Sequence, residues 1–155
     1  MRRSKQPLLI LLAGSLMMSS AVGAAEGEGG VFEREIEYRQ SVMNLFSWNM
    51  KSMGAMMKGK IPYDQGVFAG HAQDLMVATS LNLLPGFPED SDEGETDALS
   101  EIWMDFEDFE KKFKDLRSAA NALNMAVSSG DQSNIKRAFS DVGKACKACH
   151  KAYKN

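Results

Sequence analysis

Apolar residues recur along most of the chain at alternating spacings of three and four residues. One such stripe begins at residue 36, another at residue 106 and another at residue 135. This spacing places the marked positions on one face of an α-helix that packs in a bundle. The stripes are Ile36, Arg39, Met43, Phe46, Met50, Met53 and Met57; Phe106, Phe109, Phe113, Leu116, Ala120, Leu123 and Val127; and Ile135, Phe139, Val142, Cys146, Cys149 and Tyr153.

A less regular segment between the first two stripes is predicted to be a further helix. Pro62 would lie in its first turn, a position that tolerates the missing N–H of proline. Its inward positions would be Val67, His71, Leu75, Ala78 and Asn82. Short links at residues 59–62 and 128–131 and a long crossing at residues 85–96, called the crossing below, connect the four helices. The sequence therefore predicts an all-α, antiparallel, up-down-up-down four-helix bundle.

The first 25 residues have the composition of a secretory signal peptide. Basic residues near the start precede an apolar run at residues 7–18, and small residues at 21–25 offer cleavage after Ala24 or Ala25. The apolar run is too short for a stable membrane span, and the two adjacent arginines are weak evidence for a twin-arginine signal. We therefore expect export to the periplasm and a mature domain at residues 26–155 without a membrane span.

The charge of the chain disfavours nucleic acid as a partner. The 155 residues carry 18 Lys and Arg against 21 Asp and Glu, and removal of the three basic residues of the signal peptide leaves 15 against 21, a net charge near −6. Six acids lie within residues 89–97, but Gly94 and the absence of the closing pattern do not match a calcium-binding EF-hand loop. We interpret this segment as a solvated acidic loop that is able to steer a basic redox partner.

The sequence Cys-Lys-Ala-Cys-His at residues 146–150 contains the only two cysteines and one of the two histidines. This is the spacing of c-type haem attachment, in which two thiols add to the two vinyl groups of one haem and the next imidazole binds the iron. A structural zinc site needs four ligands, a thioredoxin-like motif needs a strand before its helix, and cysteines three apart on a helix rarely form a disulfide. The motif therefore predicts one haem c, held by thioethers to Cys146 and Cys149, with His150 as axial ligand.

Arg39 interrupts the apolar stripe of the first helix. A buried guanidinium requires a compensating partner, and the propionates of a haem are suitable anions. The alternative is a position at the rim of the bundle, where the side chain extends to water. One turn further on, Met43 faces the same core, and its sulfur is a potential axial ligand that would raise the reduction potential of the iron.

Four segments of the chain resemble the cytochrome c′ family. They are Tyr-Arg-Gln-Ser at 38–41, Lys-Gly-x-x-Pro-Tyr-Asp at 58–64, Glu-Ile-Trp at 101–103 opening the third helix, and Val-Gly-x-x-Cys-Lys-Ala-Cys-His-x-x-Tyr at 142–153. Together they span essentially the whole mature chain in the order of the family. The resemblance implies one covalently attached haem c, nitric oxide and carbon monoxide as ligands, electron transfer with an unidentified partner, a homodimer through the first two helices, and no dedicated enzyme activity.

The resemblance also implies roles for individual residues. Arg39 and Gln40 match the pair on the propionate side of the haem, and Met43 matches the position over its distal face. Asp97 lies near a segment that touches the haem in the family. Lys154 stands where the family usually has an arginine, so the charge is kept but the planar fork of donors is lost.

Met43 separates two functions. If it packs over the iron without binding it, the haem is five-coordinate, high-spin and open to gases, in an apolar pocket with no evident hydrogen-bond donor for dioxygen. If its sulfur binds the iron, the protein is a six-coordinate low-spin His/Met electron carrier. Because Arg39 and Gln40 resemble the five-coordinate branch of the family, we favour the open site.

Other residues have simpler interpretations. Methionines at 43, 50, 53, 56 and 57 could suit copper(I), but the heptad spacing of those at 43, 50, 53 and 57 favours core packing. His71 is expected to be a surface or partly packed residue and not an iron ligand. Trp48, which lies off the stripe, is expected at a dimer interface.

Overall fold

The computed structural model describes residues 30–155, and the predicted signal peptide lies outside them. The described part of the chain is helical apart from its connecting loops and one short antiparallel bridge. Its elements are α1 (Glu33–Met57), α2 (Gln65–Thr79), the 3-10 helix η1 (Leu84–Gly86), α3 (Glu101–Met104), α4 (Phe106–Ser129) and α5 (Gln132–Tyr153).

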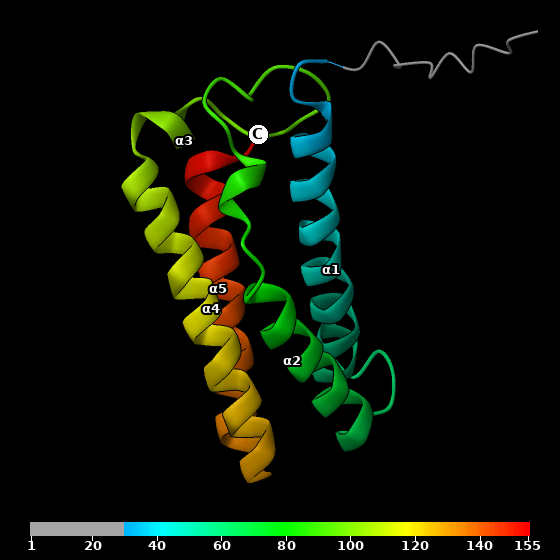
Figure 1. Cartoon of the computed structure of the whole chain (residues 1–155). Coiled ribbons are helices and arrows are strands. Elements are labelled where there is room, and N and C mark those ends of the chain that lie inside the picture. The colour runs from blue at the N-terminus through cyan, green and yellow to red at the C-terminus, as the bar shows by residue number, and fades with distance from the viewer. Residues whose placement is uncertain (1–29) are drawn as a thin grey trace, which may run out of the picture.

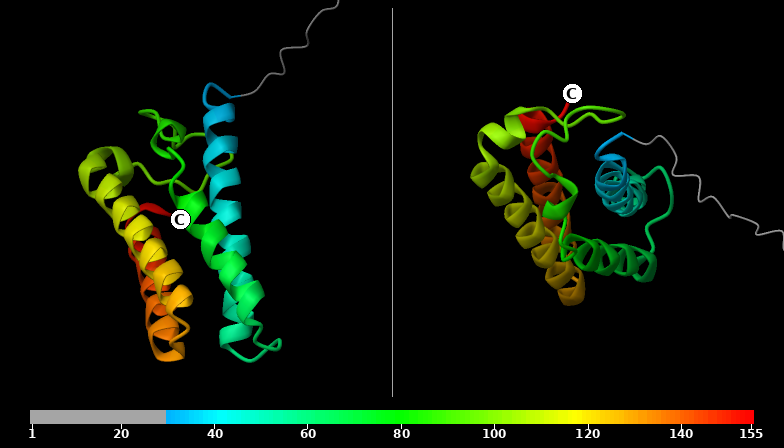
Figure 2. Two further views of the ribbon diagram at one scale, coloured as in Figure 1. Left: turned by 60° about the horizontal axis from the view of Figure 1, so that its bottom comes forward. Right: turned by 45° about the horizontal axis from the view of Figure 1, so that its top comes forward.

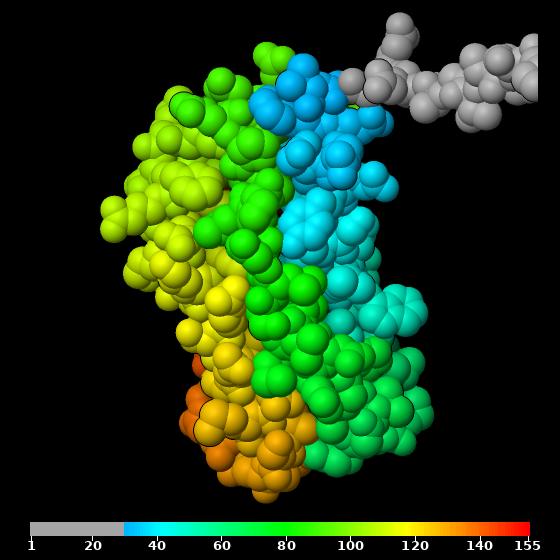
Figure 3. Space-filling model, viewed as in Figure 1, coloured from blue at the N-terminus to red at the C-terminus, as the bar shows by residue number. Residues whose placement is uncertain are grey.

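The four long helices alternate in direction along the bundle (Figure 1). The most extensive packing joins α4 to α5, α1 to α2, and α2 to α4. The crossing, α3 and the C-terminus gather at one end of the bundle, near the start of α1 (Figures 1 and 2). In the space-filling view, α2 and the crossing fill the front between α1 and α4 (Figure 3). The predicted all-α antiparallel four-helix bundle is confirmed.

Aspartates start three of the long helices. Asp64 accepts a hydrogen bond from the Val67 amide, and Asp131 accepts from two amides in the first turn of α5. These carboxylates satisfy N–H groups that have no partner within the helix and complement the helix dipole. At the other end of α4, Gly130 adopts φ 72°, a left-handed conformation in which glycine ends a helix at little cost.

The bounds of α2 differ from the prediction. The helix begins at Gln65 after the Asp64 cap and ends at Thr79, so Pro62 lies in the preceding link and Asn82 lies beyond the helix. The Asp64 side chain can cap the first turn only if the helix starts after it, and this fixes a start three residues later than proline placement suggested.

The buried face of α2 is also displaced from the predicted one at its first half. Phe68 and Ala72 are fully buried, whereas Val67 is 51% exposed and His71 is half-buried. Leu75 and Ala78 were predicted correctly. Because α2 carries apolar residues on more than one side, its sequence alone does not fix the face that packs.

The third predicted helix is divided in two. The Glu-Ile-Trp segment forms the one-turn helix α3, and Asp105, with φ −141° and ψ 65°, breaks the helical backbone before α4 begins. Asp105 then caps α4 by accepting a hydrogen bond from the Asp108 amide at 3.1 Å. The predicted stripe of α4 is buried from Phe109 to Val127, but Phe106 at its start is 36% exposed.

Helix α1 buries a wider arc than the predicted stripe. Met43 and Met50 are only partly buried, because they line a cavity. The side chains that α1 buries against its neighbours are Ile36, Arg39, Val42, Phe46, Asn49, Met53 and Met56.

The end of the bundle away from the crossing is a closed hydrophobic core. Met53 of α1, Phe68 of α2, Leu123 of α4 and Ile135 of α5 are all 0% exposed. The Phe68 ring also packs edge-on against Phe139, with centroids 6.1 Å apart. This end of the molecule is therefore packed by side chains from all four long helices.

The crossing packs closely against α1 at Gly86. A Cβ atom added there would lie 3.0 Å from the Cβ of Arg39, 3.0 Å from Cδ1 of Tyr38 and 3.3 Å from the carbonyl oxygen of Glu35. The Tyr38 hydroxyl also donates to the carbonyl of Asn82 at 2.7 Å, just before η1. Only glycine allows the two segments to approach so closely.

Tyr153 fastens the last turn of α5 to α4. Its hydroxyl donates to Oδ2 of Asp108 at 2.7 Å, and its ring packs edge-on against Phe109 with centroids 5.5 Å apart. The side chain is 7% exposed. Burial, followed by the hydrogen bond to Asp108, raises the pKa of Tyr153, so the hydroxyl keeps its proton and remains a donor.

Substitution of Gly86 tests the close approach. Gly86→Ala should lower the free energy of unfolding by about 1–3 kcal/mol, because the added methyl group overpacks the contact with α1. The matched control is Gly70→Ala within α2, where no atom lies within 4 Å of the new Cβ; it should be neutral or stabilising by up to about 1 kcal/mol. Equilibrium urea unfolding measures both, and equal stability of the two variants would contradict this packing.

Removal of the Tyr153 hydroxyl tests the attachment of α5. Tyr153→Phe should lower the free energy of unfolding by about 0.5–1.5 kcal/mol, the net contribution of a typical hydrogen bond. Tyr63→Phe is the control, since its hydroxyl donates to Gln65 on the exposed surface and should contribute about 0.5 kcal/mol at most. Urea unfolding that ranks the two variants in the opposite order would show that the Tyr153 hydroxyl does not fasten the helix.

Candidate haem site

A cavity of about 600 Å³ is lined by α1 on one side and by α4 and α5 on the other. Phe87 and Thr96 of the crossing and Ile102 of α3 also line the cavity. Its volume falls in the range of roughly 300–1,000 Å³ that is typical of small-molecule and cofactor sites. Most of the lining is apolar, as expected for a site that holds a large aromatic macrocycle.

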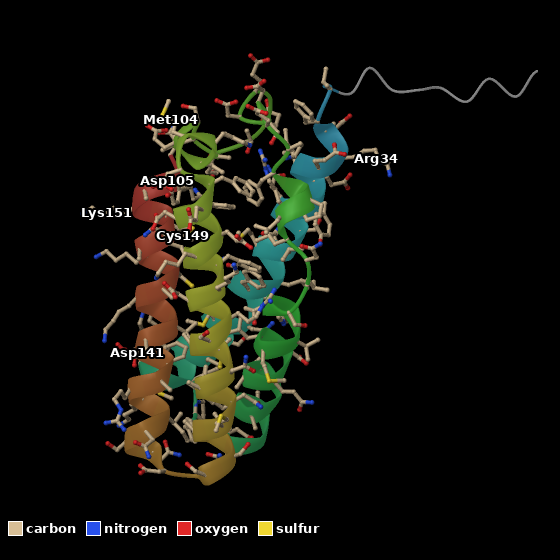
Figure 4. All side chains as sticks on the ribbon, turned by 60° about the vertical axis from the view of Figure 1, so that its left-hand side comes forward. Arg34, Met104, Asp105, Asp141, Cys149 and Lys151 are labelled. Atoms are coloured by element: carbon tan, nitrogen blue, oxygen red, sulfur yellow. The ribbon has the colours of Figure 1, made fainter. Side chains whose placement is uncertain are left out.

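Helix α5 brings the three residues of the predicted haem motif to this cavity. Cys146, Cys149 and His150 all line it. Lys151, the next residue, extends away from the bundle (Figure 4). The spacing of the motif on one helix therefore places both thiols and the imidazole at the same wall.

The protonation states of these residues fit haem attachment. Burial raises the pKa of Cys146 and raises that of Cys149 to about 11, so both sulfurs are neutral near pH 7. A thioether sulfur is also neutral, and the bond to a haem vinyl carbon therefore adds no buried charge. His150 is exposed to solvent, but its partial desolvation beside the cavity and the charge of Lys154 lower its pKa, which favours the neutral imidazole that is able to bind iron.

Across the cavity, α1 presents a largely apolar face. Met43, Phe46 and Met50 line the cavity, together with the half-buried Ser47. Met43 and Met50 are seven residues apart and therefore lie on the same face of the helix. Met43 thus lines the cavity from α1, across from the helix that carries the haem motif.

Arg39 is buried, and oxygens of the crossing accept hydrogen bonds from its guanidinium. The side chain is 3% exposed, which excludes the alternative of a rim position in water. Nη1 donates to the Gly86 carbonyl at 3.0 Å and to Oγ of Ser91 at 2.8 Å. Nη2 donates to the Ser91 carbonyl and to Oγ1 of Thr96 at 2.8 Å. Neutral oxygens of the crossing satisfy these four donors.

An aromatic ring and a carboxylate of the crossing also interact with the Arg39 guanidinium. Its guanidinium carbon lies 4.7 Å from the centroid of the Phe87 ring, within reach of a cation–π interaction. Burial lowers the pKa of Arg39, and the carboxylate of Asp92 opposes the shift. Only the Nε–H of the five guanidinium donors has no partner in the described structure. Arg39 thus serves chiefly to hold the crossing against α1.

Gln40 reinforces the same contact from the exposed side. Its Nε2 donates to the carbonyl of Glu95 at 2.7 Å. Arg39 and Gln40 both line the cavity as well. Both side chains therefore lie at the cavity and connect α1 to the loop that forms part of its wall.

Asp97 and Lys154, which the sequence singled out separately, form an ion pair. Nζ of Lys154 lies 2.7 Å from Oδ2 of Asp97, and the backbones of Ala98 and Lys154 pair in an antiparallel bridge. Both charged residues line the cavity. Their side chains are 65% and 45% exposed, so the pair positions the C-terminus more than it stabilises the fold.

Lys112 is a site residue that the sequence did not indicate. It lines the cavity from α4, and its Nζ lies 3.1 Å from Oδ2 of Asp108. Its charge acts against the burial that raises the pKa of Cys149. A lysine beside an apolar helical stripe is ordinarily a solvent-exposed residue, so no local pattern distinguishes this one.

His71, Met53 and Met56 do not line the cavity. Nδ1 of His71 lies 2.9 Å from Oδ1 of the buried Asn49, which confirms a partly packed histidine. Met53 and Met56 are buried in the core, away from the methionines that line the cavity.

Among residues 30–155, no three His, Cys, Asp or Glu side chains cluster in a way that would hold a metal ion. Within the same residues, no helix has the length and apolar character needed to span a membrane.

The sequence is similar to those of known proteins. Residues 34–154 match the family model of cytochrome c′. Cytochrome c′ from Halomonas halodenitrificans is 39% identical over 76% of this chain and 93% of its own. Cytochrome c-554 from Cereibacter sphaeroides is 33% identical over 79% of this chain and 93% of its own.

Solved structures share the fold. Cytochrome c prime from Shewanella frigidimarina matches with a TM-score of 0.77 and 43% identity, over 80% of this chain and 96% of its own. The nitric oxide complex of a point mutant of cytochrome c prime from Alcaligenes xylosoxidans matches with a TM-score of 0.72 and 32% identity, over 84% and 98%. The chain belongs to the cytochrome c′ family and binds one covalently attached haem c.

Proposed function

We propose that the protein is a periplasmic, five-coordinate, high-spin haem c protein that binds nitric oxide and carbon monoxide and takes part in electron transfer. Cys146 and Cys149 hold the haem through thioethers, and His150 binds its iron from α5. The observation that carries this proposal is the mostly apolar face of α1 across the cavity from the haem motif. The bound haem supplies a coordination position for a small ligand and a one-electron redox couple.

The side chains of α1 explain the choice of gases. Met43 and Phe46 line the cavity opposite α5, where they exclude water from the distal side. Nitric oxide and carbon monoxide are small and uncharged, and they depend less than dioxygen on hydrogen-bond donors. The nitric oxide complex of the related Alcaligenes xylosoxidans protein supports this assignment.

Arg39 and Gln40 are assigned to the propionate side of the haem, and Asp97 to its edge. Both members of the pair line the cavity, and the free Nε–H of Arg39 is the donor available to a propionate. Asp97 acts together with Lys154, so this part of the wall carries a neutral ion pair. Asp97 therefore neutralises the charge of Lys154, which does not act on the face of the haem.

Ligation by Met43 is the alternative function. Its flexible side chain lines the cavity on the helix that faces His150, and a thioether bond to iron would give a six-coordinate low-spin electron carrier. In either case no further acid, base or nucleophile is required, because binding and electron transfer need only the haem. We therefore propose no dedicated enzyme activity.

The predicted export of the protein and the acidic charge of its crossing indicate what kind of redox partner it would meet. The predicted signal peptide, with cleavage after Ala24 or Ala25, would place the domain at residues 26–155 in the periplasm. The acidic segment at residues 89–97 overlaps the crossing, which forms part of the cavity wall. An unidentified partner with a basic surface would be steered toward this end of the bundle.

The exposed apolar side chains of α1 and α2 support a homodimer. Leu45 and Trp48 of α1 are 48% and 68% exposed, and Val67 and Val77 of α2 are 51% and 53% exposed. Exposed apolar residues of this size are typical of association surfaces, and tryptophan is a frequent anchor. We propose that a second copy covers them.

Absorption spectra before and after carbon monoxide test the open site. The reduced protein should show a broad high-spin spectrum that converts rapidly to a carbonyl form. A sharp low-spin spectrum that is indifferent to carbon monoxide would contradict the proposal and favour ligation by Met43.

Met43→Ala distinguishes the two coordination states directly. With an open site, the variant should remain high-spin and bind carbon monoxide at least as fast as the parent, because only steric cover is removed. A change from low-spin to high-spin on substitution would assign Met43 as the sixth ligand.

Sedimentation velocity tests the proposed dimer. Trp48→Glu should raise the dissociation constant of the dimer by about tenfold or more, since it buries a charge at the interface. Met125→Glu is the control, because Met125 on α4 is 72% exposed and lies outside the proposed surface. Equal effects of the two substitutions would place the interface elsewhere.

A further inference from the structure

Ser47 places a hydroxyl group on the α1 face of the cavity. It follows Met43 by four residues and precedes Met50 by three, so the three side chains share one face of the helix. All three line the cavity, and Ser47 is half-buried. The face opposite the haem motif thus carries a polar group between two methionines.

The Ser47 hydroxyl is free to bind a ligand. A serine within a helix often donates to the carbonyl four residues earlier, as Ser118 and Ser128 do on α4 at 3.0 Å. Ser47 makes no such bond to Met43 or to any other residue between 30 and 155. Its donor is therefore not occupied by the described part of the chain.

The other polar residue on this part of α1 is placed less favourably. Asn44 also lines the cavity, but it is exposed to solvent. It follows Met43 directly and is rotated by about 100° from it around the helix axis. Ser47, by contrast, is about 40° from Met43, and so it lies on the face toward the cavity.

A ligand on the iron opposite His150 would bind against this face, because His150 reaches the cavity from α5. A hydroxyl donor stabilises a ligand whose outer atom carries negative charge more than it stabilises carbon monoxide. Dioxygen and small anions belong to the first group. The sequence suggested an apolar pocket with no hydrogen-bond donor. The structure differs, because the Ser47 hydroxyl lines the cavity.

We propose that Ser47 is the hydrogen-bond donor to the ligand on the α1 side of the haem, and that it favours small ligands whose outer atom accepts a hydrogen bond. This assignment rests on the proposed open site. It makes Ser47 a determinant of ligand selectivity, whereas Met43 and Phe46 supply steric cover.

Carbon monoxide on the ferrous protein and fluoride on the ferric protein test this role in the full chain with its haem. Ser47→Ala should raise the carbonyl stretching frequency and raise the fluoride dissociation constant about three- to tenfold, the effect of one hydrogen bond. The carbon monoxide association rate should stay within about twofold of the parent. Ser47→Thr keeps the hydroxyl and should restore both values. Ser41→Ala is the control on the exposed side of α1 and should leave both unchanged.

The results separate this inference from the proposed function. If the parent binds carbon monoxide but Ser47→Ala leaves the stretching frequency and fluoride affinity unchanged, the donor role is overturned and the open site stands. If the parent is low-spin and binds neither probe, the open site and the role of Ser47 are both overturned. Alanine is a better helix former than serine, so loss of folding does not complicate the comparison.

Discussion

The buried guanidinium of Arg39 holds the crossing against α1, and the wall of the haem cavity depends on this attachment. The crossing contains only the short η1, so few of its backbone oxygens have partners of their own. Arg39 supplies four donors to three of its residues. Gly86 permits the approach because it has no side chain. A charge in an apolar stripe thus organises the loop that closes one end of the bundle.

The turn that carries His150 is attached on two sides. Tyr153 binds Asp108 of α4 through its hydroxyl, and its carbonyl accepts a hydrogen bond from the Leu99 amide at 3.1 Å. Lys154 then pairs with Asp97 beside the crossing. These contacts follow His150 by three and four residues, so they fix the last turn of α5 from both α4 and the loop. Such outer contacts orient the residues that bind a metal centre.

The sequence predicted the helical bundle and the haem motif because both depend on spacing within one segment. The stripe of α4 and the cysteine spacing on α5 needed no distant partner. The sequence did not predict that Arg39 binds Ser91 or that Asp97 meets Lys154, since those contacts join residues more than fifty positions apart. The break at Asp105 was also missed, because the apolar pattern continues across it. Ser47 went unnoticed because polarity beside a stripe ordinarily indicates solvent.

The closed core around Met53, Phe68, Leu123 and Ile135 has a consequence for how this protein can change over evolutionary time. These side chains are fully buried and do not line the cavity, although they belong to the same hydrophobic core as the cavity residues Phe46 and Phe113. Substitutions in the pocket lining usually cost stability, and a fold tolerates them only while it stays above its threshold. Because these four side chains contribute to the core without lining the ligand site, a lineage can exchange residues around the iron and acquire new ligand preferences while this part of the core is kept.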